Sequence, residues 1–232
     1  MDIRGKVILV TGANRGLGKA FVIALLEGGA AKVYAGARDP SSVNIPGSTP
    51  IALDITDQAS VQRAAEQAND VSVVINNAGF LKYGSLLADD SVENLQQHLD
   101  VNTFGTLRVS RAFAPILAKQ GGGALINVLS VLSWLSPPGA GGYSTSKSAQ
   151  WGLTNGLRGE LREQGTLVIG VHPAYIDTDM VADIQAPKST PQEVVALTLQ
   201  ALSEDREEVL VSDTSHGVKA SLSSDSPVYL NR

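Results

Sequence analysis

Short runs of apolar and β-branched residues recur along the chain, and each run is bounded by Gly, Pro, Asp or Asn. Runs of this length and composition are typical of strands that are buried on both faces. Seven strands are predicted in this way, at 7–10, 32–35, 50–53, 71–75, 124–129, 166–171 and 208–211.

Helical patterns lie between these runs, at 16–28, 57–68, 91–119, 143–164 and 191–202. The last begins with Thr190-Pro191-Gln192-Glu193, which combines a capping box with proline at the first helical position. Residues 39–49 are expected to hold at most one helical turn, and the polar tail after Ser212 is expected to pack loosely.

This alternation of strands and helices predicts an α/β fold: a doubly wound, mostly parallel seven-stranded sheet with helices on both faces. Right-handed crossovers between parallel strands place the helices on both sides of the sheet. A chain of 232 residues commonly forms one such unit, so residues 1–232 are expected to be a single domain.

The composition narrows the possible partners. The net charge is −5 and no basic block occurs, which argues against nucleic acid. Without cysteine and with only three histidines, the chain is not expected to bind a metal. The first apolar run is too short and wrongly flanked for a signal peptide or membrane span, so no membrane partner and a cytoplasmic location are expected.

A glycine-rich loop follows the first predicted strand and leads into the first helix. Glycines let a backbone turn sharply and approach a diphosphate, whose charge is met by the free amides at a helix start. The spacing differs from the general dinucleotide motif G-x-G-x-x-G, so a plain turn stays an alternative. The candidate cofactor residues here are Gly12, Asn14, Arg15, Gly16, Leu17 and Gly18.

The second predicted strand is followed by Arg38, where an NAD site usually places an acid against the ribose. Arg38, together with Arg15, could hold a 2′-phosphate through charge-assisted hydrogen bonds. NADP(H) is therefore the favoured cofactor, and NAD(H) stays open. In the alternative interpretation both arginines are solvated surface charges, and the neighbouring Asp39 supports it.

Tyr143 and Lys147 stand four residues apart at the start of a predicted helix, so they share one face. A phenol ordinarily titrates near 10, and a neighbouring cation favours its ionised form. Lys147 is thus expected to lower the pKa of Tyr143. The pair alone is a common coincidence, so its surroundings decide what it means.

Those surroundings resemble the short-chain dehydrogenase/reductase family over about residues 5 to 212. The resemblance rests on the 11–18 loop, Asn76-Asn77-Ala78-Gly79, Asn102, Ser130, Tyr143 with Lys147, and the 173–178 segment. It implies that Tyr143 is the general acid/base, that Lys147 lowers its pKa and binds the nicotinamide ribose, and that Ser130 orients the carbonyl. Asn102 would hold a water in a relay to the lysine, although an Asn inside a long helix also suggests a kink.

The resemblance also implies further cofactor contacts, from Asn77, Ala78, Gly79, Asp54, Ile55, Pro173, Ile176 and Thr178. Asp54 would meet the adenine amino group, but it also suits a helix start. Ile176 and Thr178 would hold the nicotinamide carboxamide. Ala174 replaces the family's usual glycine, which raises a question about the local turn.

The resemblance further implies a small-molecule carbonyl or alcohol as substrate. Bulky side chains in the surrounding loops suit an apolar or aromatic carbonyl, or else belong to the core or an interface. They are Phe80, Tyr83, Leu132, Trp134, Leu135, Tyr175 and Met180. A homodimer or homotetramer through the helices at 91–119 and 143–164 is expected by resemblance.

Two other functions are alternatives to this interpretation. Ser144-Thr145-Ser146-Lys147 also matches the Ser-x-x-Lys motif of serine acyl-transferases, but the companion motifs of that chemistry are absent. A non-catalytic protein that senses the dinucleotide or acts as a scaffold is the stronger alternative, because a fold does not establish a function.

Overall fold

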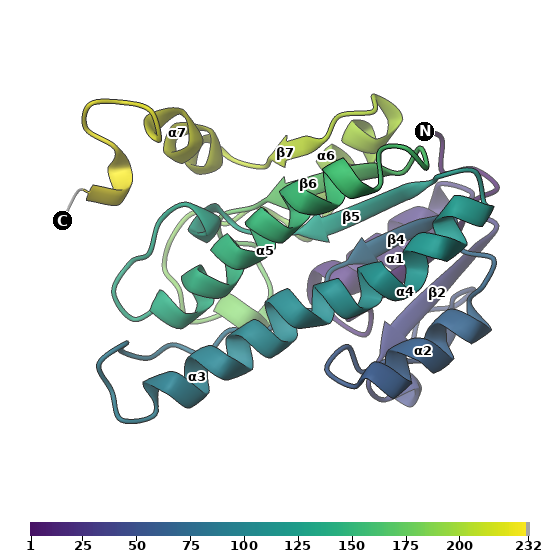
Figure 1. The fold of residues 1–232 in the computed structure, drawn as a ribbon, viewed down its shortest axis with the longest axis horizontal. Coiled ribbons are helices and arrows are strands. Elements are labelled where there is room, and N and C mark those ends of the chain that lie inside the picture. The colour runs from purple at the N-terminus through teal and green to yellow at the C-terminus, as the bar shows by residue number, and fades with distance from the viewer. Residues whose placement is uncertain (231–232) are drawn as a thin grey trace.

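The computed structural model describes residues 1–230, and it contains a seven-stranded sheet in the order β3-β2-β1-β4-β5-β6-β7. Every neighbouring pair of strands is parallel, which confirms the predicted doubly wound α/β class (Figure 1). The strands are β1 (Val7–Thr11), β2 (Lys32–Ala37), β3 (Thr49–Ala52), β4 (Val73–Asn76), β5 (Ala124–Val128), β6 (Leu167–His172) and β7 (Glu208–Leu210).

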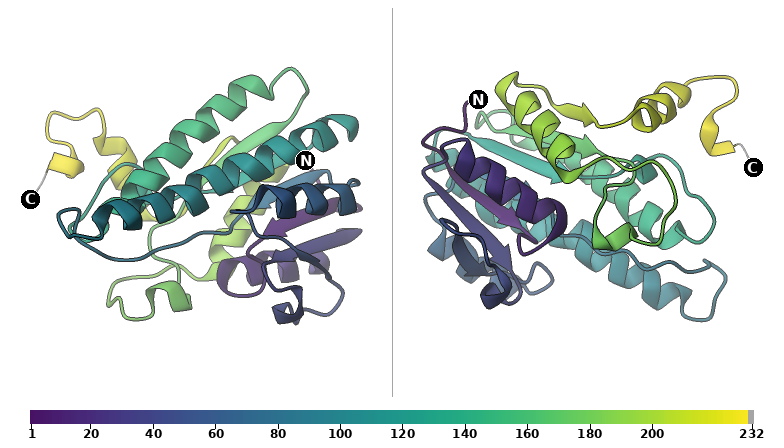
Figure 2. Two further views of the ribbon diagram at one scale, coloured as in Figure 1. Left: turned by 60° about the horizontal axis from the view of Figure 1, so that its bottom comes forward. Right: turned by 180° about the vertical axis from the view of Figure 1, so that it is seen from behind.

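Helices cover both faces of this sheet. Those on one face are α1 (Gly16–Glu27) and α6 (Pro191–Ser203), and those on the other are α2 (Gln58–Gln67), α4 (Thr106–Lys119) and α5 (Gly141–Glu160). Figure 2 shows α1 and α6 together on the rear face. Successive side chains of a strand point to opposite faces, so Ile8 and Val10 join the core under Phe21 whereas Leu9 joins the core under Phe113.

The predicted helix at 91–119 is interrupted. It consists of α3 (Ser91–His98), a π-helical segment at Leu99–Gly105 and then α4. Asn102 lies inside the π-helical segment, so the irregularity that its position suggested is present. Such segments are common at functional sites.

Many boundaries differ from the predictions by one or two residues, and the end of α5 differs by four. Helix α5 begins at Gly141 and ends at Glu160, against an expected 143–164, and β4 begins at Val73 rather than at 71. The tail after Ser212 was expected to pack loosely. This was wrong for its first part, which forms α7 (Asp213–Ser221) and buries Ser215 and Val218, whereas Val228, Tyr229 and Leu230 further along are exposed. The prediction of a single turn within 39–49 is confirmed by the 3-10 helix at Pro40–Ser42.

No helix within residues 1–230 has the length and apolar character that crossing a bilayer requires. Over the same residues, no group of three His, Cys, Asp or Glu side chains is placed to hold a metal ion.

Candidate active site at the carboxyl edge of the sheet

The glycine loop, residues 77–79, Ser130 and the 173–178 segment follow β1, β4, β5 and β6 respectively. All strands are parallel, so their carboxyl ends meet at one edge of the sheet. The order reverses between β1 and β4, and open α/β sheets bind ligands at such a switch point. The fold therefore brings the glycine loop, Ser130 and the 173–178 segment to the same edge.

The glycine loop is shaped by close backbone contacts. Gly12 and Gly16 have φ of +63° and +51°, which favours glycine. A Cβ on Gly12 would lie 2.9 Å from the Cα of Ala78, and one on Gly18 would lie 2.1 Å from the carbonyl oxygen of Gly12. A side chain at 12 would therefore push the glycine loop away from Ala78, and one at 18 would push the first turn of α1 away from the glycine loop.

The start of α1 suits a diphosphate. Arg15 precedes the helix in extended conformation, no side chain caps the helix, and its first turn holds no acid. The free amides and the positive end of the helix dipole are therefore available to an anion. Arg15 is exposed and Asn14 half-buried, whereas the Leu17 side chain is buried in the core, so only the backbone of Leu17 faces the loop.

Asn77 holds the glycine loop in place. Its side-chain amide donates hydrogen bonds to the carbonyl oxygens of Thr11 and Gly12, at 3.0 and 3.1 Å. The Thr11 hydroxyl in turn accepts from the backbone amides of Asn77 and Ala78, both at 3.0 Å. The side chain of Asn77 thus holds the backbone of the glycine loop. Its predicted contact with the cofactor stays a prediction.

Arg38 stands free at the end of β2. It is exposed, and within residues 1–230 no hydrogen bond or ion pair engages its guanidinium. The Asp39 carboxylate does not pair with it, because it accepts from the amide and hydroxyl of Ser41, at 2.9 and 2.7 Å. Arg38 therefore remains available to an anion.

The carboxylate of Asp54 forms its hydrogen bonds within the loop between β3 and α2. Its carboxylate accepts from the amide and hydroxyl of Thr56, at 2.9 and 2.7 Å, while Asp57 rather than Asp54 caps α2. Burial acts to raise the pKa of Asp54, but the bonds from Thr56 and the nearby guanidinium groups of Arg38 and Arg108 lower it overall. The adjacent Ile55 side chain is buried against Gly105.

Tyr143, Lys147 and Ser130 come together where β5 ends and α5 begins. The Lys147 amine lies 5.6 Å from the centre of the Tyr143 ring. It donates to the Val128 carbonyl at 2.9 Å and to the Gln150 side-chain oxygen at 2.8 Å. The Ser130 hydroxyl accepts from the amide of Leu132 at 3.0 Å, and Ser130 is buried.

The protonation of this group differs from the expectation. Desolvation raises the pKa of Tyr143 to about 12, with the Ser130 hydroxyl acting to lower it and Tyr83 to raise it. Burial also lowers the pKa of Lys147 to about 7. The predicted lowering of the Tyr143 pKa by Lys147 is therefore contradicted, because desolvation of the phenol decides the direction of the shift.

Asn102 fixes the chain after Gly79. Its side-chain oxygen accepts from the Phe80 amide at 2.8 Å, and its side-chain nitrogen donates to the Phe80 carbonyl and to the Ser146 hydroxyl, both at 2.9 Å. These bonds join the π-helical segment to the loop after β4 and to α5. Its predicted part in a relay through water stays a prediction.

The 173–178 segment lies against the glycine loop. Pro173 is buried and its carbonyl accepts from the Val131 amide at 2.8 Å. A Cβ on Gly16 would lie 3.3 Å from the Thr178 methyl, so Thr178 sits directly against the loop. Ala174 does not have positive φ, so this turn does not need glycine. Ile176 forms an isolated bridge with Ser189, which closes the short loop between them.

The bulky side chains near the site differ in how far they are exposed. Phe80, Leu132, Leu135 and Tyr175 are half-buried, and Tyr83 and Met180 are exposed at 48% and 49%. Trp134 is different: it is 8% exposed and packs against His172, Trp151 and the Val218 side chain of α7. Trp134 therefore belongs to a satellite core rather than to the substrate side.

Two buried histidines beside the site were not predicted. Both nitrogens of His98 are bonded: Nδ1 donates to the Asn94 carbonyl at 2.8 Å, and Nε2 accepts from the Lys82 amide at 3.1 Å. Its ring lies 6.1 Å from that of Tyr143, and burial lowers its pKa. His98 had one usable signal in the sequence, since it precedes Asn102 by about one helical turn.

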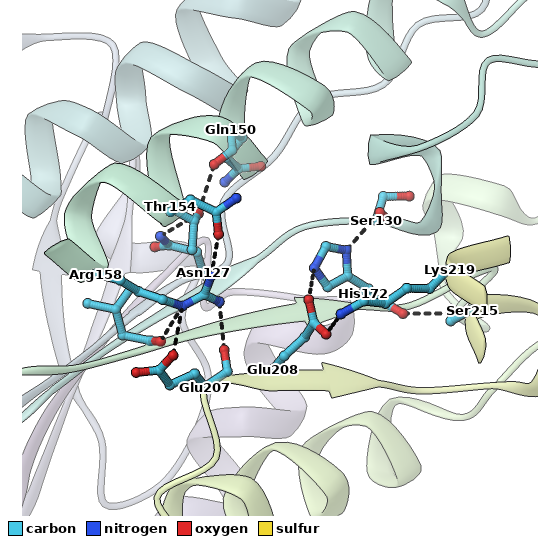
Figure 3. Close-up of polar contacts among 12 residues, drawn as sticks. Asn127, Ser130, Gln150, Thr154, Arg158, His172, Glu207, Glu208, Ser215 and Lys219 are labelled. Atoms are coloured by element: carbon cyan, nitrogen blue, oxygen red, sulfur yellow. Dashed lines mark hydrogen bonds and ion pairs between the residues drawn. The ribbon is translucent and has the colours of Figure 1, made fainter. Parts of the chain in front are cut away.

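The second histidine, His172, lies directly behind the serine (Figure 3). Its Nδ1 bonds the Ser130 carbonyl at 3.2 Å, and its ring stacks on Trp134 with centroids 4.0 Å apart. Its own carbonyl accepts from the Ser215 hydroxyl of α7 at 2.7 Å. Burial lowers the pKa of His172 to about 3, so the ring is neutral and supports the serine's backbone.

Fold and site together define a doubly wound protein of the dinucleotide-binding class. A family model described as short chain dehydrogenase matches residues 6–189. A crystal structure of a short chain dehydrogenase from Burkholderia cenocepacia J2315, in complex with NADP, is 40% identical with a TM-score of 0.93, covering 97% of this chain and 95% of that one. The chain belongs to the short-chain dehydrogenase family, a family of NAD(P)-dependent oxidoreductases.

Named relatives agree with this assignment. The 1-deoxy-11-beta-hydroxypentalenate dehydrogenase of Streptomyces exfoliatus is 31% identical over 227 residues, covering 89% of this chain and 82% of that protein. A short chain dehydrogenase of Aspergillus terreus is 34% identical over 204 residues, covering 80% of this chain. The match covers 44% of the Aspergillus protein, so this chain spans less than half the length of that relative.

Proposed function

We propose that the protein is an NADPH-dependent reductase that interconverts a carbonyl and an alcohol. The observation that carries the proposal is the grouping of Ser130, Tyr143 and Lys147 beside a glycine loop that fits a diphosphate. The family supplies the reaction class, and this grouping supplies a proton donor next to the cofactor.

The choice of NADPH rests on Arg38. A free, exposed guanidinium at the end of β2 can pair with a 2′-phosphate, and the carboxylate of the adjacent Asp39 is engaged by Ser41. The Burkholderia structure in complex with NADP supports the same choice. NAD(H) would lack the phosphate that this guanidinium can hold.

Tyr143 is the proposed proton donor in the reductive direction. Bound NADPH supplies the hydride. Ser130 and Tyr143 donate hydrogen bonds to the carbonyl oxygen of the substrate. A phenol with a pKa of about 12 is protonated at neutral pH, so it is ready to give its proton to the oxygen that gains negative charge. Lys147, beside the phenol, offers a cation to the phenolate that is left behind.

The substrate is proposed to be a small molecule with a bulky apolar or aromatic part. The half-buried Phe80 packs against His98 beside Tyr143, Tyr175 is also half-buried, and Met180 is exposed. The relative named 1-deoxy-11-beta-hydroxypentalenate dehydrogenase supports this choice. Apolar surfaces of this kind bind ligands through their shape and area.

A homodimer or homotetramer through the long helices is also part of the proposal. Phe104 and Leu107, at the junction of the π-helical segment and α4, are 49% and 37% exposed. Burial of these side chains against a second copy would remove apolar surface from water. A cytoplasmic location stays a prediction.

The decisive experiment follows NADPH oxidation against a panel of aldehydes and bulky ketones. Tyr143→Phe is expected to keep NADPH binding and to lower turnover by about two to four orders of magnitude, the usual contribution of a positioned acid. Tyr229→Phe, at an exposed position, serves as the matched control and is expected to keep full activity. Unchanged turnover in Tyr143→Phe would refute the proton donor, and NADPH binding without turnover of any carbonyl by the wild type would favour a sensor.

A further inference from the structure

Gln150 is a fully buried amide whose two ends are both bonded. Its side-chain oxygen accepts from the Lys147 amine at 2.8 Å, and its side-chain nitrogen donates to the Thr106 hydroxyl at 2.8 Å. The Thr106 hydroxyl in turn donates to the Asn102 carbonyl at 2.9 Å. Gln150 and Thr106 are 0% and 1% exposed. An unbroken chain of side-chain hydrogen bonds therefore runs from the lysine to the π-helical segment.

The chemistry of the two ends fixes the direction of every bond in this chain. A Lys147 ammonium can only donate, so the oxygen of the Gln150 amide must face it. The Asn102 carbonyl can only accept, so the Thr106 hydroxyl must donate to it and offer its oxygen to the Gln150 nitrogen. A flipped amide would set a donor against a donor, so Gln150 has a single orientation.

The backbone of Gln150 is anchored as well, as Figure 3 shows. Its carbonyl accepts from the Thr154 hydroxyl at 2.8 Å, and that hydroxyl accepts from the Asn127 side chain of β5 at 3.0 Å. Thr154 and Asn127 are both 0% exposed. Both the backbone and the amide of Gln150 are thus tied to the neighbouring β5 and α4, and the residue has little freedom to leave the lysine.

We propose that Gln150 is a positioning residue for the reaction: it holds the Lys147 amine at the site and links it through Thr106 to the carbonyl of Asn102. This inference rests on the proposed function, in which Lys147 supports Tyr143. The chain of bonds fixes a charge and does not carry a proton, because a side-chain amide does not readily pass a proton from its nitrogen to its oxygen. Two protons of the ammonium are engaged by Val128 and Gln150, and the third is free for Tyr143 or the cofactor.

Two other groups that can titrate face the Lys147 amine. Tyr143 lies on the same helix, and the neutral His172 lies on β6. In the part of the chain that the structure describes, no carboxylate forms an ion pair with Lys147. The ammonium form therefore depends on two neutral oxygens, the Val128 carbonyl and the Gln150 amide, to offset its loss of water.

The test measures the titration of Lys147 directly and needs no substrate. The chain has eight lysines, so ¹³C-labelled lysine gives few signals, and Lys147→Met identifies the signal of interest. Gln150→Leu keeps the volume but removes the acceptor, and the Lys147 midpoint is expected to fall by about one pH unit, the worth of one hydrogen bond to a charged group. Gln164→Leu, which removes a bonded amide at the far end of the sheet, is the matched control and should leave the midpoint unchanged.

Thr106 provides an independent arm if Gln150→Leu does not fold. Thr106→Val is expected to lower the midpoint less than Gln150→Leu, Thr106→Ser to restore it, and the double variant to match Gln150→Leu alone, because both changes act on one chain of bonds. An unchanged midpoint in both Gln150→Leu and Thr106→Val would overturn the inference, as would strictly additive effects. Active Lys147→Met in the NADPH assay would instead refute the proposed function, so the two failures are distinguishable.

Discussion

His172 gives the stability of this protein a pH dependence that can be calculated. The imidazole is 0% exposed, stacks on Trp134 and bonds the Ser130 carbonyl, and burial lowers its pKa to about 3. In the unfolded chain the same ring titrates at its ordinary value of about 6.5. Between these two values the unfolded chain binds a proton that the folded protein does not.

This difference in proton binding sets how the free energy of unfolding changes with pH. Above pH 6.5 both states are neutral at His172 and the group has no effect. As the pH falls below 6.5 the unfolded state gains a proton, so the free energy of unfolding decreases, and the loss is complete only near pH 3. Between pH 7 and pH 5, His172 alone is expected to remove about 2 kcal/mol of stability.

The assay is urea unfolding at several pH values, with His172→Gln as the perturbed protein. The variant loses the ring stacked on Trp134, so its stability is lower throughout, but its loss between pH 7 and pH 5 should be smaller than that of the wild type by about 2 kcal/mol. His216→Gln, at an exposed position on α7, should keep the wild-type dependence. Parallel curves for His172→Gln and the wild type would refute the idea that a buried neutral imidazole causes the effect.

Two further predictions concern cofactor binding. Arg38→Ala is expected to weaken the binding of NADPH about tenfold to a hundredfold and to leave NADH binding nearly unchanged, because the lost guanidinium contacts only the extra phosphate. Fluorescence titration measures both affinities, with Arg63→Ala as the control. Equal losses of affinity for both cofactors would count against Arg38. Gly18→Ala is expected to weaken NADPH at least about tenfold, because its Cβ would lie 2.1 Å from the Gly12 carbonyl oxygen. The same NADPH affinity in Gly18→Ala and in the wild type would contradict the close-packed loop. Gly217→Ala is the control, because nothing lies within 4 Å of its added Cβ, and it should raise the free energy of unfolding by up to about 1 kcal/mol in thermal unfolding.

The strands were predictable because each is a short apolar run between turn residues, and burial on both faces leaves such a run no other stable place. Helix α7 was not, because it is short and polar and buries only Ser215 and Val218. Its position depends on Trp134 and on the carbonyl of His172, which lie far away in the sequence. Local patterns carry no information about such contacts.

In the candidate site, too, some features could be predicted from the local sequence and others depend on distant contacts. Spacing was enough to place Tyr143 and Lys147 on one face. The position of Asn102 inside a long helical pattern suggested a kink, and the structure has a π-helical segment there. The pKa of Tyr143 was mispredicted because desolvation depends on what surrounds the phenol. Gln150 could have been found, since it follows Lys147 by three residues and so lies beside it on the helix. Its second partner, Thr106, belongs to another helix and needed the fold.

The π-helical segment at Leu99–Gly105 sets how α4 is rotated relative to α3. Each of its residues advances the chain through a smaller angle than in an α-helix, so the seven residues together fix which side of α4 meets the sheet. Deleting one residue there would turn Phe113 and Leu117 away from the interior or else pull Asn102 off Phe80. This stretch should therefore tolerate exchanges of side chain far better than any change in its number of residues.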